Sequence, residues 1–555
     1  MAAITPSSDL YLIKSPLELN DSNQLNFADR QIQANYFLSL PKIAVDDFTY
    51  IRKDGVIRYP AHIDSILQYN YVMYRNENYS DKWFYAYITG MEYINDNMTS
   101  ITIKTDCFQT WQFDLRYMPC FVERETVLDD TIGANTVPEG LDSGEPIYQG
   151  GEQSYRYGRY ASGSTVASYQ IGFMVSDVLP DPYPDAGLHR YIDFNNAVGA
   201  SGDFYNNIYS GCWMFAVGSR EAARAIINAY DGTGRGDAIV SMFAIPWDLF
   251  DANGQVAHSV TIDGTPVTLF TFNGSRDAHD CATLTIPKTN ALNYYKPKNN
   301  KMWTYPYYYY EASNNNGMSA IYKYEDFKSK NEQSTQVQFK VFGALCQGCS
   351  FKLFPINYKA LGTDYNALTD YSLNGGKLPT FAWASDFFLN WQAQNSKAVE
   401  IQAIGSGISA IGSFLTGNIG GTVSALGSIV GQMAEVDKMS KAPDQARGNV
   451  NAGDINHSMN LGGFTIKPMG CRYEMAEKID RFFSMYGYKV NMVKIPATSG
   501  RLNWNYVKTI NSYIEGDIPQ GDLNEIKQQF DNGITIWHNP KTFMDYDQDN
   551  SIKIG

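Results

Sequence analysis

The sequence has little of what enzymes and disulfide-bonded domains carry. Six histidines are scattered along the 555 residues, and no paired-carboxylate motif can be placed. The seven cysteines, spread between Cys107 and Cys471, are odd in number and do not fit a disulfide framework. The lone pair Cys346 and Cys349 is better explained by a hairpin turn than by a metal or redox site. The sequence therefore predicts no catalytic residue, no metal and no cofactor.

Basic clusters are missing as well. The formal net charge is −14, and no Lys/Arg cluster appears that would neutralise phosphates. This argues against a protein that grips nucleic acid. It does not argue against one past which DNA moves, because an acidic wall repels DNA. The first residues lack the basic start and apolar core of a signal peptide, so we expect synthesis in a reducing cytoplasm.

What the chain does have is apolar and aromatic content. Apolar residues make up 44%, aromatic residues 14% and charged residues only 18%, which indicates large cores and not a disordered chain. The 40 tyrosines favour pleated, half-buried surfaces and subunit contacts. The length exceeds one ordinary core. We predict a mainly β, multidomain protein.

Local patterns predict individual elements. Apolar and polar residues alternate over 69–74, 82–88 and 100–104, and 95–97 has turn residues. This pattern predicts an antiparallel meander. Strand patterns at 169–175, 212–217 and 238–243 surround a helical pattern over 220–229 that Ser219 would cap, which predicts an inserted α+β module. Further strands are expected at 305–310, 337–341, 350–354 and 534–537.

Two local motifs complete this set. Asp522 and Glu525 have the spacing of a capping box for a helix that ends at Asn532 and Gly533. The run His279-Asp280-Cys281 is interpreted as a surface loop.

A charge-free segment at 401–434 is the most unusual part of the chain. Its apolar residues recur every three or four positions, as on one helical face. Its glycines fall in GxxxG spacing, which lets helices pack closely in lipid. The glycines for helix packing are Gly417, Gly421, Gly427 and Gly431. The predicted insertion residues are Ile404, Ile408, Ile411, Phe414, Leu415, Ile419, Val423, Leu426, Ile429 and Val430.

Two interpretations of this segment stay open on periodicity alone. One is a buried pair of core helices. The other is a membrane-active or channel-plugging loop, favoured by the glycine content, the length without charge, and the following Pro-, Gly- and Asn-rich stretch, typical of a tether. Each arm of the segment is short for a complete span, so a helical hairpin or an inserting loop fits best.

Several longer sequence motifs resemble those of the tail knob proteins of small short-tailed phages that infect Gram-positive bacteria. They are NYVMY at 70–74, KWFYA at 82–86, QTW at 109–111, EGL at 139–141, YGYKV at 486–490, NYV at 505–507 and FDNGITIWH at 530–538. The order of parts also fits, since that family places a long glycine-rich apolar loop before its C-terminal β region.

The resemblance implies a homohexamer whose β-barrel domains stack into a tube at the distal end of the tail. It implies apolar loops that plug the lumen, are expelled at ejection and penetrate the host cytoplasmic membrane. Genomic DNA would pass without specific binding, and an upper tail or collar protein would be a partner. Only residues 401–434 receive a role by this resemblance.

The predicted organisation has five parts. They are a β-rich tube domain at 1–160, an inserted α+β module at 165–330, the continued β-rich tube domain at 331–398, the apolar loop and tether at 399–463, and a C-terminal α+β part at 464–555.

Two rival functions are a receptor-binding tail protein that recognises cell-wall polymer through Tyr and Trp, and a wall hydrolase. Neither explains the charge-free segment.

Overall fold

The chain folds into two units, each assembled from segments that are far apart in the sequence. Unit 1 comprises residues 1–147, 289–308 and 470–555, and unit 2 comprises 148–288 and 309–469. The computed structural model describes residues 8–19, 22–45, 49–51, 55–76, 82–157, 169–177, 179–180, 190–192, 213–252, 255–262, 264–272, 278–328, 336–345, 348–376, 378, 380–381, 383–385, 445–447 and 462–553. The finer five-part division stays a prediction.

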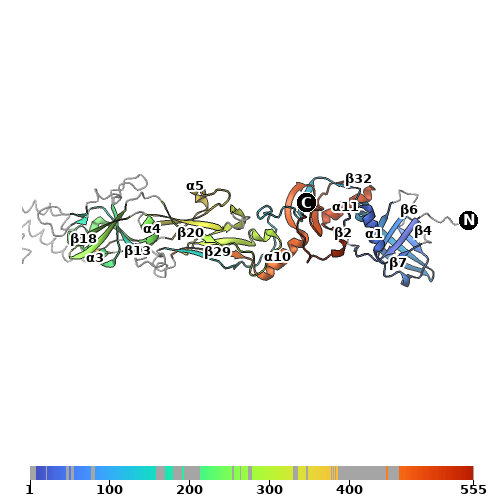
Figure 1. Ribbon diagram of the computed structural model, residues 1–555, viewed down its shortest axis with the longest axis horizontal. Coiled ribbons are helices and arrows are strands. Elements are labelled where there is room, and N and C mark those ends of the chain that lie inside the picture. The colour runs from blue at the N-terminus through green and yellow to red at the C-terminus, as the bar shows by residue number, and fades with distance from the viewer. Residues whose placement is uncertain are drawn as a thin grey trace, which may run out of the picture. The chain divides into compact units, whose positions relative to one another are not determined.

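A seven-stranded antiparallel sheet forms the first half of unit 1 (Figure 1). Its order is β3-β1-β6-β7-β8-β5-β4. The strands are β1 (Ser8–Ile13), β3 (Lys42–Ala44), β4 (Thr49–Ile51), β5 (Val56–Tyr59), β6 (Tyr71–Asn76), β7 (Phe84–Asn95) and β8 (Met98–Thr105). The predicted meander is confirmed, because β6, β7 and β8 pair in sequence and the chain turns at Asp96 and Asn97.

One face of this sheet is covered by helix α1 (Arg30–Ser39), which begins where the Asp29 side chain accepts from the amide of Ile32. Phe37 of α1 stacks on Tyr71, with ring centroids 5.4 Å apart. The Tyr71 hydroxyl donates to the buried carboxylate of Asp106 at 2.9 Å. Part of the tyrosine content therefore builds the core of one chain, because a buried ring with a hydroxyl needs an internal partner.

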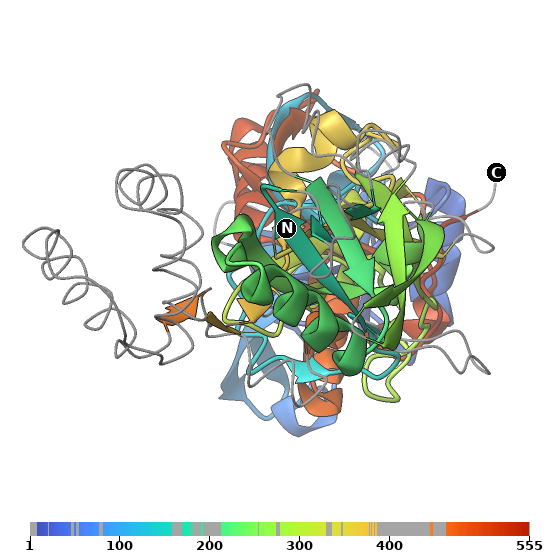
Figure 2. The same ribbon diagram turned by 90° about the vertical axis from the view of Figure 1, so that its left-hand side faces the viewer.

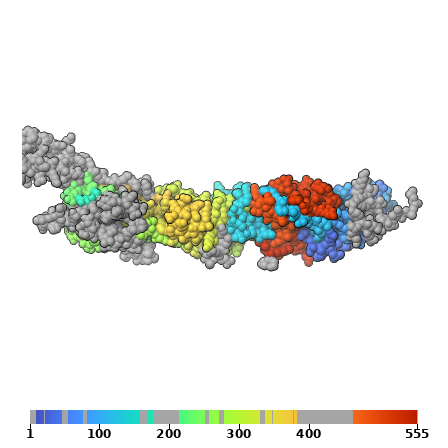
Figure 3. Space-filling model, turned by 90° about the horizontal axis from the view of Figure 1, so that it is seen from above, coloured from blue at the N-terminus to red at the C-terminus, as the bar shows by residue number. Residues whose placement is uncertain are grey.

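The second half of unit 1 joins the two ends of the chain. A five-stranded sheet has the order β2-β33-β31-β10-β30, and β2 runs parallel to β33. In Figure 3 the red C-terminal residues and the cyan residues of the first third lie side by side on this unit's surface. The strands are β2 (Asn23–Leu25), β10 (Cys120–Glu125), β30 (Tyr488–Lys494), β31 (Trp504–Ile510) and β33 (Ile534–Trp537).

Shorter elements complete unit 1. Helix α11 buries Leu523, Ile526 and Phe530 against α2 and β31. The remaining elements are η1 (Ile63–Ser65), α2 (Cys107–Trp111), β9 (Leu115–Tyr117), η3 (Asn300–Trp303), α10 (Tyr473–Tyr486), β32 (Ile514–Gly516), α11 (Gln520–Asn532) and η7 (Pro540–Thr542).

The predicted capping box is wrong, although the helix itself is confirmed. Helix α11 begins at Gln520, and its N-cap residue Pro519 makes no side-chain cap bond. Asp522 instead accepts from Trp111 Nε1 at 2.8 Å, and Glu525 pairs with Lys104 at 2.6 Å. Both carboxylates therefore bind side chains that are distant in sequence, and neither caps the helix. The predicted end is confirmed, because Gly533 takes a φ of 97°.

His538, directly after β33, makes unit 1 sensitive to acid. Its Nε2 lies 2.9 Å from Asn505 Oδ1 and its Nδ1 lies 3.4 Å from Asn26 Nδ2. The neutral ring satisfies both, because Nε2 donates and Nδ1 accepts, whereas a protonated Nδ1 would face a donor. Burial lowers the pKa of His538 to about 4, and Lys553 acts in the same direction.

We therefore expect His538→Gln to flatten the acid dependence of stability. The unfolded histidine titrates near ~6.5, so the wild-type stabilisation is complete above that pH and is lost as the pH falls toward about 4. Urea unfolding followed by tryptophan fluorescence at about pH 7 and about pH 4.5 measures this difference. Equal losses in wild type and variant would contradict the assignment.

Unit 2 contains the predicted α+β elements. A six-stranded sheet has the order β18-β19-β16-β13-β17-β26, and helix α3 lies against it (Figure 2). The N-cap is confirmed, because Ser219 Oγ accepts from the amide of Ala222. The elements are β13 (Tyr169–Val175), β16 (Trp213–Val217), α3 (Arg220–Gly232), η2 (Gly236–Ala238), β17 (Ile239–Pro246), α4 (Trp247–Ala252), β18 (Gln255–Ile262), β19 (Thr265–Phe272) and β26 (Thr380–Phe381).

Two further sheets belong to unit 2. One has the order β20-β23-β24-β25, and the other β11-β29-β21-β22 with β12 paired to β29. They consist of β11 (Ile147–Tyr148), β12 (Gln153–Arg156), β20 (His279–Ile286), β21 (Tyr308–Ser313), β22 (Ser319–Lys323), β23 (Val337–Ala344), β24 (Ser350–Pro355), β25 (Leu373–Asn374) and β29 (Gly463–Gly470). Small elements are β14 (Leu179–Pro180), β15 (Arg190–Ile192), η4 (Tyr324–Asp326), α5 (Tyr365–Leu368) and η6 (Thr369–Tyr371).

Two predictions in this region are wrong in part or completely. The run His279-Asp280-Cys281 begins strand β20 and is not a loop, because β23 pairs with it and Lys340 binds Asp280 at 2.5 Å. The strand predicted at 305–310 begins only at Tyr308, since Pro306 has no amide hydrogen for a ladder. The hairpin expected around Cys349 is confirmed by the pairing of Ala344 with Ser350.

Candidate functional site

The residues predicted to enter a membrane lie outside the described part of the chain. All ten apolar residues between Ile404 and Val430 and all four glycines between Gly417 and Gly431 fall within 386–444. Their insertion role therefore stays a prediction. No helix among the described residues has the length and apolar character needed to span a membrane.

The structure does show what flanks this segment. Strand β27 (Trp383–Ser385) precedes it and strand β28 (Gln445–Arg447) follows it, and the two pair antiparallel. Ser385 is opposite Gln445, and Trp383 is opposite Arg447. We call this ladder the neck. Figure 2 shows its two strands side by side. The neck brings both ends of 386–444 to one place.

The neck continues from the core of unit 2. Strand β26 pairs with β17 of the six-stranded sheet, with Phe381 opposite Met242. Trp383 is 7% exposed and belongs to the same hydrophobic cluster as Phe173, Ile226 and Ile239. A buried indole adds a large apolar contact area, so it fixes the start of the neck to the sheet and to α3. This anchor was not predicted from the sequence, although Phe381 and Trp383 have the spacing of strand residues that share one face.

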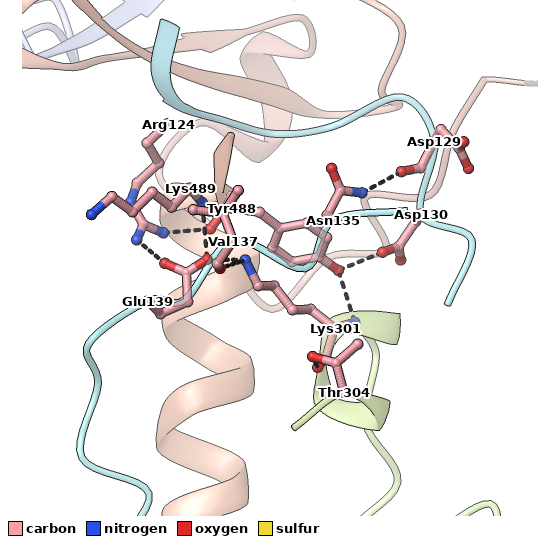
Figure 4. A network of polar contacts seen from close by, with 11 residues as sticks. Arg124, Asp129, Asp130, Asn135, Val137, Glu139, Lys301, Thr304, Tyr488 and Lys489 are labelled. Carbon is pink, nitrogen blue, oxygen red and sulfur yellow. Dashed lines mark hydrogen bonds and ion pairs between the residues drawn. The ribbon is translucent and has the colours of Figure 1, made fainter. Parts of the chain in front are cut away.

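A second feature lies in unit 1, where an irregular strap of residues 126–146 follows β10. Glu139 in this strap has a side chain with no exposure and pairs with both Arg124 and Lys301 (Figure 4). It also accepts from the amide of Lys489 at 2.9 Å. Burial lowers the pKa of Lys301, opposed by the bond to Glu139. One carboxylate thus joins three segments that are distant in sequence.

A second carboxylate holds the same strap. The Tyr488 hydroxyl donates to Asp130 Oδ1 at 2.5 Å (Figure 4). The amide of Asn300 donates to Asp130 Oδ2 at 3.2 Å. Burial raises the pKa of Asp130, and these bonds oppose that rise. Two buried acids therefore fasten the strap to η3 and β30. This network fixes the strap within unit 1.

A recess of about 210 Å³ between α1 and the seven-stranded sheet is lined by Arg30, Arg75 and Lys82. Asp114 pairs with Arg30 and, at 2.7 Å, with Lys82. Arg75 pairs with Asp9 at 2.7 Å. Carboxylates of unit 1 thus already pair with these three cations. The recess is therefore lined by an internal salt-bridge network. Within the described residues, no group of three His, Cys, Asp or Glu side chains is placed to hold a metal ion.

Comparison with known proteins explains this architecture. A family model described as Bacillus phage phi29, Tail knob protein gp9, C-terminal domain, matches residues 273–551, which is half of the chain. The chain belongs to the tail knob protein family. It is therefore a structural component of a phage tail. A second model, Caudoviral major tail protein N-terminus, matches residues 8–116, the region of the seven-stranded sheet.

Individual relatives cover nearly the whole chain. Tail knob protein gp9 of Bacillus phage phi29 is 26% identical, over 94% of this chain and 93% of the relative. The protein of the same name from Bacillus phage B103 is 25% identical, over 95% of each. The solved bacteriophage C1 tail knob protein, gp12, superposes with a TM-score of 0.65 at 12% identity and covers 98% of this chain and 100% of that chain. At this identity the last comparison shows the shared fold.

Proposed function

We propose that copies of this chain form a ring-shaped tube, a hexamer by resemblance, at the distal end of the tail. DNA passes through the tube, whose lumen we expect to be acidic or neutral, given a net charge of −14. The segment 401–434 plugs the lumen and then enters the host cytoplasmic membrane. An upper tail or collar protein holds the other end, and the role is structural and not enzymatic.

The neck is the observation that carries the membrane part of this proposal. A segment whose two ends are paired at β27 and β28 leaves the frame and returns to it at one place. It can therefore move out as one loop while the pairing of β26 with β17 stays intact.

Dye release from anionic liposomes at neutral and mildly acidic pH tests the proposal. We expect leakage by the full chain and none by a chain lacking 401–434. The substitution Ile411→Asp should strongly reduce leakage, since a charge at mid-bilayer costs about 2.5–3.5 kcal/mol. The matched control Asn395→Asp adds the same charge just outside the segment and should leak like wild type.

Rings seen by electron microscopy separate the parts of the proposal. Intact rings with unchanged leakage in the Ile411→Asp chain would contradict membrane entry by the segment. The proposal that copies of the chain form a tube would still stand. Loss of both rings and leakage in the deletion chain would indicate that the segment serves the fold or the assembly instead.

A further inference from the structure

The neck is attached to the rest of unit 2 by little backbone pairing. Among the described strands, β27 and β28 pair only with each other. The preceding strand β26 pairs with β17 through Thr380 and Phe381. Along its other edge, β17 pairs with β13 over the whole length of that strand. The backbone bonds that hold the neck are therefore few, and side chains have to supply the rest.

One large side chain supplies this further attachment. Trp383 is the first residue of β27, and its side chain lies in the hydrophobic cluster formed by the six-stranded sheet and α3. Phe381 is partly buried against the same cluster, because residues two positions apart in a strand share a face. The chain thus enters the neck from a two-residue ladder and one buried indole.

This indole is buried with an unpaired donor. In the part of the chain that the structure describes, Trp383 Nε1 is shielded from solvent and has no hydrogen-bond acceptor. Three indoles of unit 1 show the usual arrangement, in which Nε1 donates to an oxygen 2.8–3.0 Å away; they are Trp111, Trp504 and Trp537. A buried donor without an acceptor loses the bond that it makes to water when exposed. The apolar burial of Trp383 is therefore partly offset.

The surrounding sheet is held more firmly than this anchor. Phe173 and Phe215 of the same cluster stack with ring centroids 5.2 Å apart. They belong to β13 and β16, which have a paired strand on each side. Exposing Trp383 would free its Nε1 to bind water and would break no pair of these central strands. Segments with few backbone pairs open locally at a lower free energy than the whole domain.

We propose that Trp383 is a releasable anchor of the neck. In the released state its indole has left the cluster, β27 and β28 have moved away from the sheet together, and β13, β16 and β17 stay paired. The unpaired Nε1 lowers the free energy needed for this opening. The use of the opening to free the segment 401–434 rests on the proposed function, whereas the opening itself does not.

An isosteric replacement on the full chain tests the part played by the donor. In Trp383→benzothienylalanine, a sulfur atom replaces the indole N–H and the shape of the ring is kept. A ladder as short as the neck is marginal by itself, so amide hydrogen exchange in β27 and β28 reports how often the anchor is released. We expect exchange there to slow by about tenfold, because burial no longer leaves a donor unpaired. Exchange as fast as in wild type, or faster, would overturn the proposal.

Removing the anchor tests whether the opening is local. Trp383→Ala should speed exchange in β27 and β28 by about tenfold or more and leave β13 and β16 as protected as in wild type. The comparison variant Phe215→Ala, in the same cluster but on a central strand, should lower the protection of β13 and β16 themselves. Loss of protection in β13 and β16 of the Trp383→Ala chain would show an ordinary core residue and overturn the proposal.

Dye release from anionic liposomes separates this inference from the proposed function. The benzothienylalanine chain should leak more slowly than wild type. Slower exchange in its neck together with no leakage by wild type would leave the anchor standing and contradict only membrane entry. Slower exchange with leakage at the wild-type rate would overturn the use of the anchor in freeing the segment.

Discussion

The substitution Glu139→Ala is expected to lower the free energy of unfolding of unit 1 by about 3–5 kcal/mol. The Glu139 carboxylate is completely buried and pairs with Arg124 and Lys301, whose side chains are 12% and 3% exposed. Removing it leaves two cations with little water and no anion, and desolvation then dominates. The amide of Lys489 also loses its acceptor.

Amide hydrogen exchange in β10 and β30 measures this effect within unit 1, where a single melting temperature for a two-unit chain would not. The matched control is Glu145→Ala. Glu145 is 90% exposed and lies 3.8 Å from Arg472, so its removal should change little. Equal protection of β10 and β30 in the Glu139→Ala chain and wild type would show that water replaces the carboxylate.

The substitution Gly487→Ala should be at least as damaging. Gly487 ends helix α10 with φ 63° and ψ −154°, a conformation that side chains rarely adopt. A Cβ atom there would lie 2.0 Å from the carbonyl oxygen of Glu125, so α10 or β10 would have to shift. We expect a loss above about 3 kcal/mol, combining backbone strain with this collision.

Gly521→Ala is the matched control with the opposite sign. Gly521 lies in the first turn of α11, and a Cβ atom there meets nothing within 4 Å. Alanine should stabilise the helix by up to about 1 kcal/mol. Amide hydrogen exchange in α10 and α11 of both variants beside wild type checks both signs within unit 1, and a Gly487→Ala chain as well protected as wild type would refute the account of this turn.

The elements that the sequence predicted correctly carry their information locally. Alternation over β6, β7 and β8 needs only neighbouring residues, and Ser219 caps α3 from the adjacent position. Errors arose where distant partners took over local groups. Asp522 looked like a cap and instead binds Trp111, more than 400 residues away.

What the sequence could not supply is long-range pairing. Nothing local indicates that β2 pairs with β33, or that Glu139 would join β10, η3 and β30. The row of Phe121, Val493 and Ile510 has the same origin, because these residues become neighbours only in the sheet. For the apolar segment the situation is reversed, since the sequence describes its chemistry and the structure describes only its two ends.

The neck also has an evolutionary consequence. Because β27 and β28 meet as a ladder, the frame constrains the two end points of 386–444 and not the length or composition between them. For a flexible insert, doubling the length costs only about 0.6 kcal/mol in closure entropy. The segment is therefore expected to behave as an exchangeable cassette. Under the membrane entry proposed above, a change in its length would adapt the segment to a bilayer of different thickness without a change in the sheets of either unit.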